Sequence, residues 1–342
     1  MASVLDDNKQ KPVQQNPAHY KQRILSGFVI VLALLAFFAL RIWVNSYVVD
    51  LLIGVLMIVS AYEVDNLLHK MGRPTYFLGF GVYPLLSFIS VLVCLSLGLS
   101  FLWYVLINLG IILVLGIGMA FLPLISKKTV YKNRIADGYK YGNVRYSITK
   151  SLNTCFVCVW PVFLFSFAFA INHFNNFELA INQNWLSYSG VEGVDVGIIG
   201  LLLLFVTTVL ADTCAMLIGR LLKTPKINLQ KLGPGKSWGG LLGGVIGALI
   251  GALCVYGVLS LFNNYSTLFT ILDISILHFV VIGLVCGLFN MVGDIFSSYF
   301  KRRAVVKDFS QLIPGHGGVM DRINGLVLNS FCVFAILLIL FA

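Results

Sequence analysis

Long apolar segments constrain the fold of this chain more than any other feature of its sequence. A helix needs roughly 20 apolar residues to cross a bilayer, and because lipid offers no hydrogen-bond partners, such a segment must satisfy its own backbone groups. The runs are too continuous for the alternating strands of a membrane barrel. We therefore predict an all-α, polytopic integral membrane protein with about nine transmembrane helices. The predicted spans are residues 24–42, 47–64, 77–97, 101–125, 152–174, 196–219, 238–262, 276–296 and 323–341.

The composition excludes the common alternatives. Of the 342 residues, 58% are hydrophobic and only 11% are charged, whereas a soluble domain carries about 25% charged residues. Disorder is excluded as well, because it requires low hydrophobicity. The formal net charge of +10 would suggest nucleic acid as a partner of a soluble protein. In a membrane protein, the position of the cations along the chain has to be considered first.

The cations follow the predicted topology. With nine spans, every Lys and Arg except Arg41 falls in the N-terminal tail or in alternate connections, while the connections 175–195 and 263–275 carry only acidic charges. The positive-inside rule assigns the cationic side to the cytoplasm. We therefore predict a cytoplasmic N-terminus and a C-terminus outside, with no affinity for nucleic acid.

The polar motifs are unevenly distributed along the chain. The first half is nearly featureless apolar sequence, whereas the second half is rich in glycine and polar motifs. We predict that the chemistry resides in the second half. The predicted regions are a polar cytoplasmic tail (1–23), N-terminal transmembrane helices (24–174) and a C-terminal catalytic transmembrane region (196–342) with cytoplasmic motif loops at 220–238 and 297–322.

Two carboxylates in the predicted spans are candidate functional groups, because a charge within a membrane is costly and usually functional. They are Asp212 and Asp294. If the helix containing Asp294 continues, Ser298 and Lys301 follow at i+4 and i+7 and share its face. A carboxylate, a hydroxyl and an ammonium in one stripe suit a hydrated Mg²⁺ ion and phosphate oxygens.

A glycine-rich loop follows this stripe. Residues 314–318 read Pro-Gly-His-Gly-Gly, a run that breaks a helix and lets a ligand or another segment approach the backbone. Asp321 and Arg322 then open the last span, where a helix N-terminus favours anionic groups. We predict that Asp294 and Asp321 share one or two metal ions. For His316, a metal ligand, an acid/base and a loop hydrogen-bonder all remain open.

A second polar patch lies at residues 233–240, with Gly-Lys-Ser at its centre. It is not a nucleotide P-loop, because Gln230 stands where the first glycine belongs and no soluble strand precedes it. We predict that Lys236 binds phosphate at the mouth of the following span. Trp238 is open to a different interpretation, as an anchor at the membrane interface.

Segment 298–324 resembles the signature of the phosphatidate cytidylyltransferases, also called CDP-diacylglycerol synthases. The spacing of that signature is kept throughout. The residues that carry the resemblance are Ser298, Lys301-Arg302, Lys307-Asp308, Pro314-Gly315-His316-Gly317-Gly318 and Asp321-Arg322, with Ala211-Asp212-Thr213, Gly219-Arg220 and Pro234-Gly235-Lys236-Ser237-Trp238 upstream.

The resemblance implies a Mg²⁺-dependent transfer in which phosphatidic acid attacks the α-phosphate of CTP, giving CDP-diacylglycerol and pyrophosphate for phospholipid biosynthesis. It also implies an active site that faces the cytoplasm from the cell membrane, and it raises a homodimer as the assembly. The roles it implies are metal binding by Asp294 and Asp321, phosphate binding by Lys236, Arg302, Lys307 and Arg322, and catalysis by Asp212, Ser298, Lys301, Asp308 and His316.

Four positions depart from the family pattern. Asn324 replaces the final Asp of Asp-Arg-x-Asp, Ser297 stands where Glu is frequent, and Gly233 and Gly239 replace the Ser and Glu around the Pro-Gly-Lys segment. Asn keeps an oxygen ligand but loses a negative charge. The departures leave a divergent non-catalytic paralogue as an alternative, beside a membrane transporter and a cytidylyltransferase for another lipid phosphate.

Overall fold

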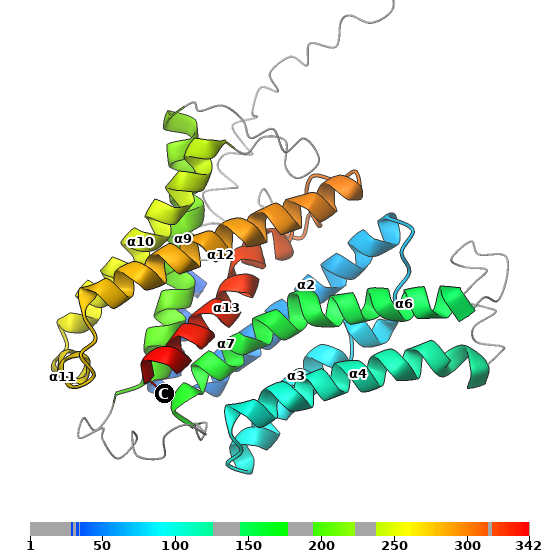
Figure 1. The fold of residues 1–342 in the computed structure, drawn as a ribbon, viewed down its shortest axis with the longest axis horizontal. Coiled ribbons are helices and arrows are strands. Elements are labelled where there is room, and N and C mark those ends of the chain that lie inside the picture. The colour runs from blue at the N-terminus through cyan, green and yellow to red at the C-terminus, as the bar shows by residue number, and fades with distance from the viewer. Residues whose placement is uncertain are drawn as a thin grey trace, which may run out of the picture.

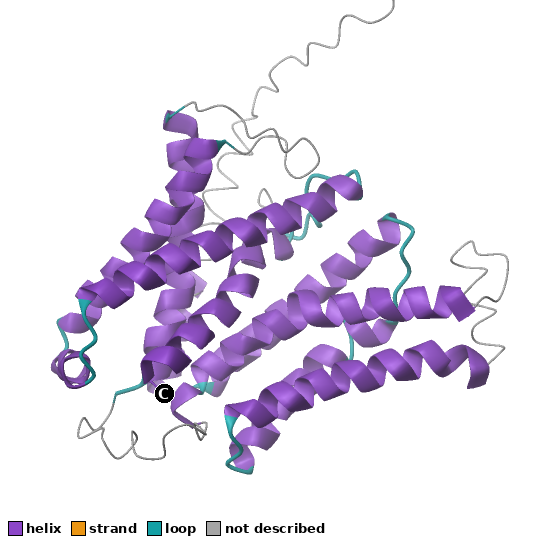
Figure 2. Ribbon diagram, viewed as in Figure 1, coloured by secondary structure: helices purple, strands orange, loops and turns teal. Residues whose placement is uncertain are grey.

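The prediction of an all-α membrane protein is confirmed. The computed structural model describes residues 29, 32–33, 35–125, 144–176, 194–222, 237–313 and 317–341, and these contain helices and turns but no β-strand (Figure 2). Eight of the described helices are long and apolar enough to cross a membrane. The first predicted span, 24–42, lies partly outside the described residues, and its described part is helical. The count of nine and the orientation therefore stay predictions.

The described residues of the first half of the chain contain four of these spans. The helix that begins at residue 47 continues beyond the predicted end at 64, because its terminal acidic side chains are buried against other segments rather than solvated. The elements of this half of the chain are α2 (Tyr47–Lys70), η1 (Phe77–Gly79), α3 (Tyr83–Ser96), α4 (Phe101–Ile125), α6 (Val144–Val157), η2 (Cys158–Phe163), α7 (Leu164–Asn172) and η3 (Phe174–Asn176).

The second half of the chain forms the other four described spans and one short helix. The short helix, α11, lies in the segment 263–275 that the sequence predicted as a connection. The ring of Phe269 stacks on Tyr256 and meets Phe279 edge to face. The elements are α9 (Val196–Leu221), α10 (Trp238–Ser260), α11 (Asn263–Ile271), α12 (Ile276–Arg303) and α13 (Met320–Phe341).

Glycines allow three of these helices to pack at very short range. A Cβ atom at Gly247 of α10 would overlap the backbone of α9, and one at Gly287 of α12 would lie 2.8 Å from the Cα of Val245 in α10. Small residues are the usual means by which membrane helices approach closely. As Figure 1 shows, α9 and α10 run as a pair that α12 crosses, and α13 lies between α12 and the α6–α7 segment.

A buried polar network ties the helices together at the end of the bundle where α2 and α9 begin. Arg41, the cation that departs from the topology pattern, donates to Asp195 at 2.8 Å and to the side chain of Asn172 at 2.6 Å. Asn172 in turn donates to Asp50 at 2.7 Å, and Asp50 pairs with His173 at 2.5 Å. Because Arg41 is neutralised in this way, its position does not contradict the predicted orientation.

Candidate active site

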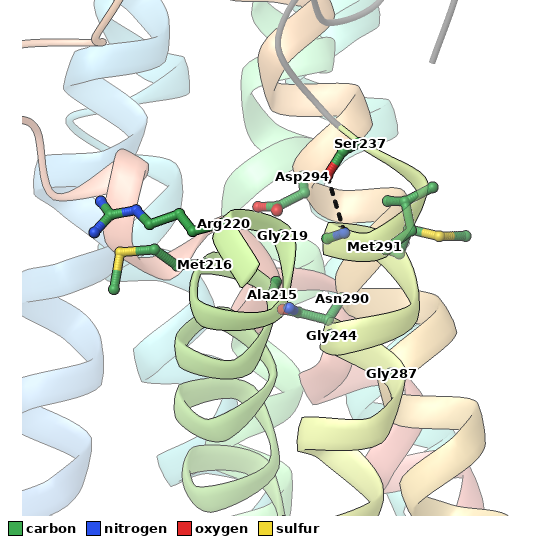
Figure 3. Close-up of a pocket in the computed structure, with 12 residues that line it drawn as sticks. Ala215, Met216, Gly219, Arg220, Ser237, Gly244, Gly287, Asn290, Met291 and Asp294 are labelled. Atoms are coloured by element: carbon green, nitrogen blue, oxygen red, sulfur yellow. Dashed lines mark hydrogen bonds between the residues drawn. The ribbon is translucent and has the colours of Figure 1, made fainter. Parts of the chain in front are cut away.

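A cavity of about 280 Å³ opens between α9, α10 and α12, at the end of the bundle where α12 ends and α13 begins. We call this end the motif end. The cavity has small residues along its α10 wall. Figure 3 shows the side chain of Arg220 pointing away from Asp294 and Ser237. The polar residues that line it are Arg220 of α9, Ser237 at the start of α10, and Asn290 and Asp294 of α12.

Ser237 begins α10 as its N-cap. Its hydroxyl accepts a hydrogen bond from the backbone N–H of Gly240 at 3.1 Å, which satisfies one of the donors that a helix start leaves open. Gly240 and Gly219 meet at this point, where a Cβ on Gly219 would lie 3.1 Å from the Cα of Gly240. The close contact places the start of α10 on the wall of the cavity, where the positive end of the helix dipole favours an anion.

Asp294 of α12 lines the cavity, and its predicted functional role stays a prediction. Its Oδ1 accepts a hydrogen bond from the side-chain amide of Asn324 at 2.9 Å. Asn324 is buried on α13, and its own oxygen accepts from the N–H of Gly325 at 2.8 Å. The residue that departs from the family pattern is therefore a donor to Asp294, which a carboxylate at this position could not be.

Asp212 is held in the same manner, one helical turn further from the motif end. The side-chain amide of Asn290 donates to its Oδ1 at 2.9 Å. Asn290 is buried, and within the described part of the chain its amide oxygen has no hydrogen-bond partner. A Cβ at Gly325 would overlap that oxygen. The glycine therefore allows α13 to pack directly against the amide that holds Asp212.

Asp321 and Lys301 form an ion pair that closes the motif end. The Lys301 ammonium donates to Oδ1 of Asp321 at 2.7 Å, and the side chains are 15% and 5% exposed. The other oxygen of Asp321 accepts from the N–H groups of Phe309 at 2.8 Å and Gly318 at 3.0 Å. Both oxygens of Asp321 are thus engaged by protein donors, and a metal ion at this carboxylate would have to displace one of them.

The remaining predicted residues divide by exposure. Ser298 is half-buried on α12, one turn beyond Asp294. Lys236 and His316 lie outside the described residues, so the structure says nothing of their predicted roles. The residues exposed around the motif end are Arg302, Lys307, Asp308 and Arg322. Three of these four residues are cations, and their charge suits the attraction of phosphates towards this end of the bundle.

The donor chemistry of α12 fits a hard cation. The side chains of Asp294 and Ser298, four residues apart, offer oxygen atoms that can bind a metal ion. Asn290 adds a buried amide oxygen that accepts no hydrogen bond from a described residue. Mg²⁺ binds few protein oxygens and retains water and phosphate as its other ligands. Among the described residues, no cluster of three His, Cys, Asp or Glu side chains comes together. Such a cluster would be needed for a cage of protein ligands alone.

Sequence reasoning missed three residues of this region. Arg220 stands only within the Gly219-Arg220 part of the family resemblance, and no motif includes Asn290 or Glu63. Glu63 is the most informative of the three, because it contacts the segment between α12 and α13 from the first half of the chain. The rule that a buried charge in a span marks a functional or structural contact would have identified it.

Comparison with known proteins gives consistent matches. The model of the family described as "Cytidylyltransferase family" matches residues 21–341. A Haemophilus influenzae protein named phosphatidate cytidylyltransferase is 39% identical over 130 residues, which are 38% of this chain and 42% of that protein. A Rickettsia conorii protein of the same name is 33% identical over 123 residues, which are 36% of this chain and 51% of that protein. The matches span about half the length of these relatives.

Proposed function

Because the chain belongs to the cytidylyltransferase family, we propose that it transfers the cytidylyl group of CTP to phosphatidic acid. The products are CDP-diacylglycerol and pyrophosphate. The observation that carries the proposal is the cavity at the motif end, which is lined by the Asp294 carboxylate, by Arg220 and by the start of α10, with the Lys301–Asp321 pair at the same end of the bundle. A transfer between phosphates needs anion binding and charge neutralisation at one place, and these groups supply both.

The transfer exchanges one phosphorus–oxygen bond for another. An oxygen of the lipid phosphate forms a bond to the α-phosphorus of CTP, and the bond from that phosphorus to the β-bridging oxygen breaks. Pyrophosphate leaves with the electron pair of the broken bond. The work left to the protein is to hold two polyanions together in line, since the reactants repel one another and are present at low concentration.

The residues divide this work by position. Arg220 and the positive end of α10 attract phosphate oxygens to the cavity, and Lys236, Arg302, Lys307 and Arg322 bind the phosphates of the nucleotide. Asp294, with Ser298, would hold Mg²⁺, whose charge neutralises the triphosphate when it is bound. Lys301 exchanges Asp321 for a substrate phosphate, and Asp321, with an oxygen then unengaged, would be the second carboxylate available to hold Mg²⁺.

The two substrates reach the cavity from different phases. The cavity lies at one end of a bundle of membrane-length helices, so a lipid can enter sideways from the bilayer while CTP arrives from water. We place this end at the cytoplasmic face of the cell membrane, in agreement with the gathering of cations there. A homodimer is the proposed assembly and is tested by the mass of the purified protein in detergent.

The proposal is tested by pyrophosphate release from the purified protein with CTP, Mg²⁺ and phosphatidic acid. Asp294→Asn should abolish release, whereas Asp273→Asn, an exposed aspartate in the loop between α11 and α12, should leave it intact. A panel of other lipid phosphates identifies the acceptor. If the wild type releases no pyrophosphate with any lipid phosphate or divalent metal, the proposal is wrong, and the non-catalytic paralogue takes its place.

A further inference from the structure

Glu63 is a buried carboxylate in the part of the chain that carries no motif. It lies in the last third of α2, and only 2% of its surface is exposed. Its charge is met by three hydrogen-bond donors, all from the segment around the start of α13. Ser310 donates its hydroxyl to Oε1 at 2.6 Å, and the backbone N–H groups of Val319 and Met320 donate at 2.9 and 2.7 Å.

The contact supplies the N-terminal cap of α13 from a distant segment. A helix start leaves its first N–H groups without partners, and they are normally satisfied by a side chain just before the helix. Here Met320 is the first residue of α13, and the acceptor is Glu63. Gly318 makes the approach feasible, because a Cβ at this position would lie 2.6 Å from the carboxylate.

Two carboxylates hold the segment between α12 and α13 at both of its ends. Glu63 binds Ser310 near the beginning of the segment and Val319 at its end. Asp321 similarly joins the N–H groups of Phe309 and Gly318. One carboxylate comes from α2 and the other from α13, so the segment is fixed to both halves of the protein.

We infer that Glu63 is a positioning residue for the proposed cytidylyl transfer, on which this inference rests. By fixing the segment from residue 309 to the start of α13, it sets the place of Asp321 and hence of Lys301 beside the cavity. Among the described residues, Glu63 contacts neither the cavity lining nor the groups assigned to substrate. Its effect is transmitted through the backbone of Val319 and Met320, two residues and one residue before Asp321.

The inference assigns a functional role to the first half of the chain. Without Glu63, the segment would lose one of the two carboxylates that hold it, and the N–H groups of Val319 and Met320 would lose their acceptor. A shift of about 1 Å in a reacting group can cost a hundredfold in rate. We therefore expect the loss of Glu63 to lower the rate of the chemical step more than the binding of CTP.

The test compares Glu63→Gln with Asp65→Asn. The glutamine side chain keeps the size of glutamate but has one acceptor oxygen and an NH₂ group that opposes a donor. Asp65 is a matched control, since it is a buried carboxylate on the same helix, 4% exposed, whose side chain bonds Thr75 and approaches His69 instead. The measurements are kcat and KM for CTP, and hydrogen–deuterium exchange of residues 309–323 in the full-length protein in nanodiscs.

We expect Glu63→Gln to lower kcat about tenfold to a hundredfold with little change in KM. The amides of Val319 and Met320 should exchange about tenfold to a hundredfold faster, and Asp65→Asn should show neither effect. Ser310→Ala, which removes one donor and leaves the carboxylate, should shift kcat and exchange in the same direction by less. It serves as the test if Glu63→Gln does not fold.

Two results would overturn the inference. One is a wild-type kcat with unchanged exchange in Glu63→Gln, and the other is an equal fall in kcat for Glu63→Gln and Asp65→Asn. An inactive wild type would instead refute the proposed function and the positioning role that rests on it. The exchange measurement would then still decide whether Glu63 fixes the segment.

Discussion

The ion pair between Lys301 and Asp321 provides a quantitative test of the structure at the motif end. We consider Asp321→Asn, which keeps the shape of the side chain and removes its charge. The carboxylate accepts three hydrogen bonds, from the Lys301 ammonium and the backbone N–H groups of Phe309 and Gly318. Asparagine has one acceptor oxygen, so its NH₂ group must face either the ammonium or the two backbone donors.

The expected cost follows from this geometry. At least one hydrogen bond to a charged group is lost, at about 1.5–3 kcal/mol, and the bonds that remain lose their charge assistance. Removing one partner of a fully buried pair costs about 3–5 kcal/mol, but Lys301 is 15% exposed and can reach water. We therefore expect Asp321→Asn to lower the free energy of unfolding by about 2–4 kcal/mol.

The assay is a double-mutant cycle with Lys301→Met, measured as equilibrium unfolding in mixed detergent micelles. Because each single variant already breaks the pair, the double variant should be more stable than the sum of the two losses predicts, with a coupling of about 1–3 kcal/mol. Lys307→Met, at an exposed lysine, is the control and should show no coupling to Asp321→Asn. Losses that add within about 0.5 kcal/mol would refute the pair as a structural contact.

Three further outcomes are expected. Asn324→Asp places a second carboxylate beside Asp294 in place of the amide donor at 2.9 Å. Without Mg²⁺ the free energy of unfolding should fall by about 1–3 kcal/mol, and it should recover as Mg²⁺ is added. A loss of stability that Mg²⁺ does not change would contradict a metal at Asp294. Gly325→Ala should destabilise the protein by about 1–3 kcal/mol, because the added Cβ would overlap a buried amide oxygen. Gly257→Ala is the control and should not destabilise the protein, because no described atom lies within 4 Å of the added Cβ. Asp50→Ala leaves a buried imidazole and amide without their acceptor at the other end of the bundle and should lower the unfolding midpoint without changing the kcat of pyrophosphate release.

The exchange of partners proposed for Lys301 links these measurements to catalysis. In the structure the lysine is bound to Asp321, and its ammonium lies 5.4 Å from the centre of the Phe309 ring. A substrate phosphate would compete with the carboxylate for the same ammonium, since both are anions that accept from it. The strength of the Lys301–Asp321 pair therefore sets part of the cost of forming the substrate complex.

The architecture and the family could both be inferred from the amino-acid sequence alone. Hydrophobicity is a local property, because each span must satisfy its own backbone and match the bilayer wherever it lies in the fold. For the same reason the sequence places Asp294 on a polar stripe of a span, and in the structure this residue lines the cavity. Its spacing to Ser298 and Lys301 is fixed by the helix in which all three lie.

The hydrogen-bond partners of these carboxylates could be learned only from the tertiary structure, because the local sequence does not predict them. The sequence placed Asp294 and Asp321 at a common metal site, a role that remains a prediction, but their partners in the fold are Asn324 for one and Lys301 for the other. Glu63 meets donors 247 to 257 positions away in the chain. Such pairings depend on how the helices pack, through glycine contacts and buried amides that no local pattern encodes. The sequence therefore specified the helices and the chemical groups, and the packing of the helices chose the partners.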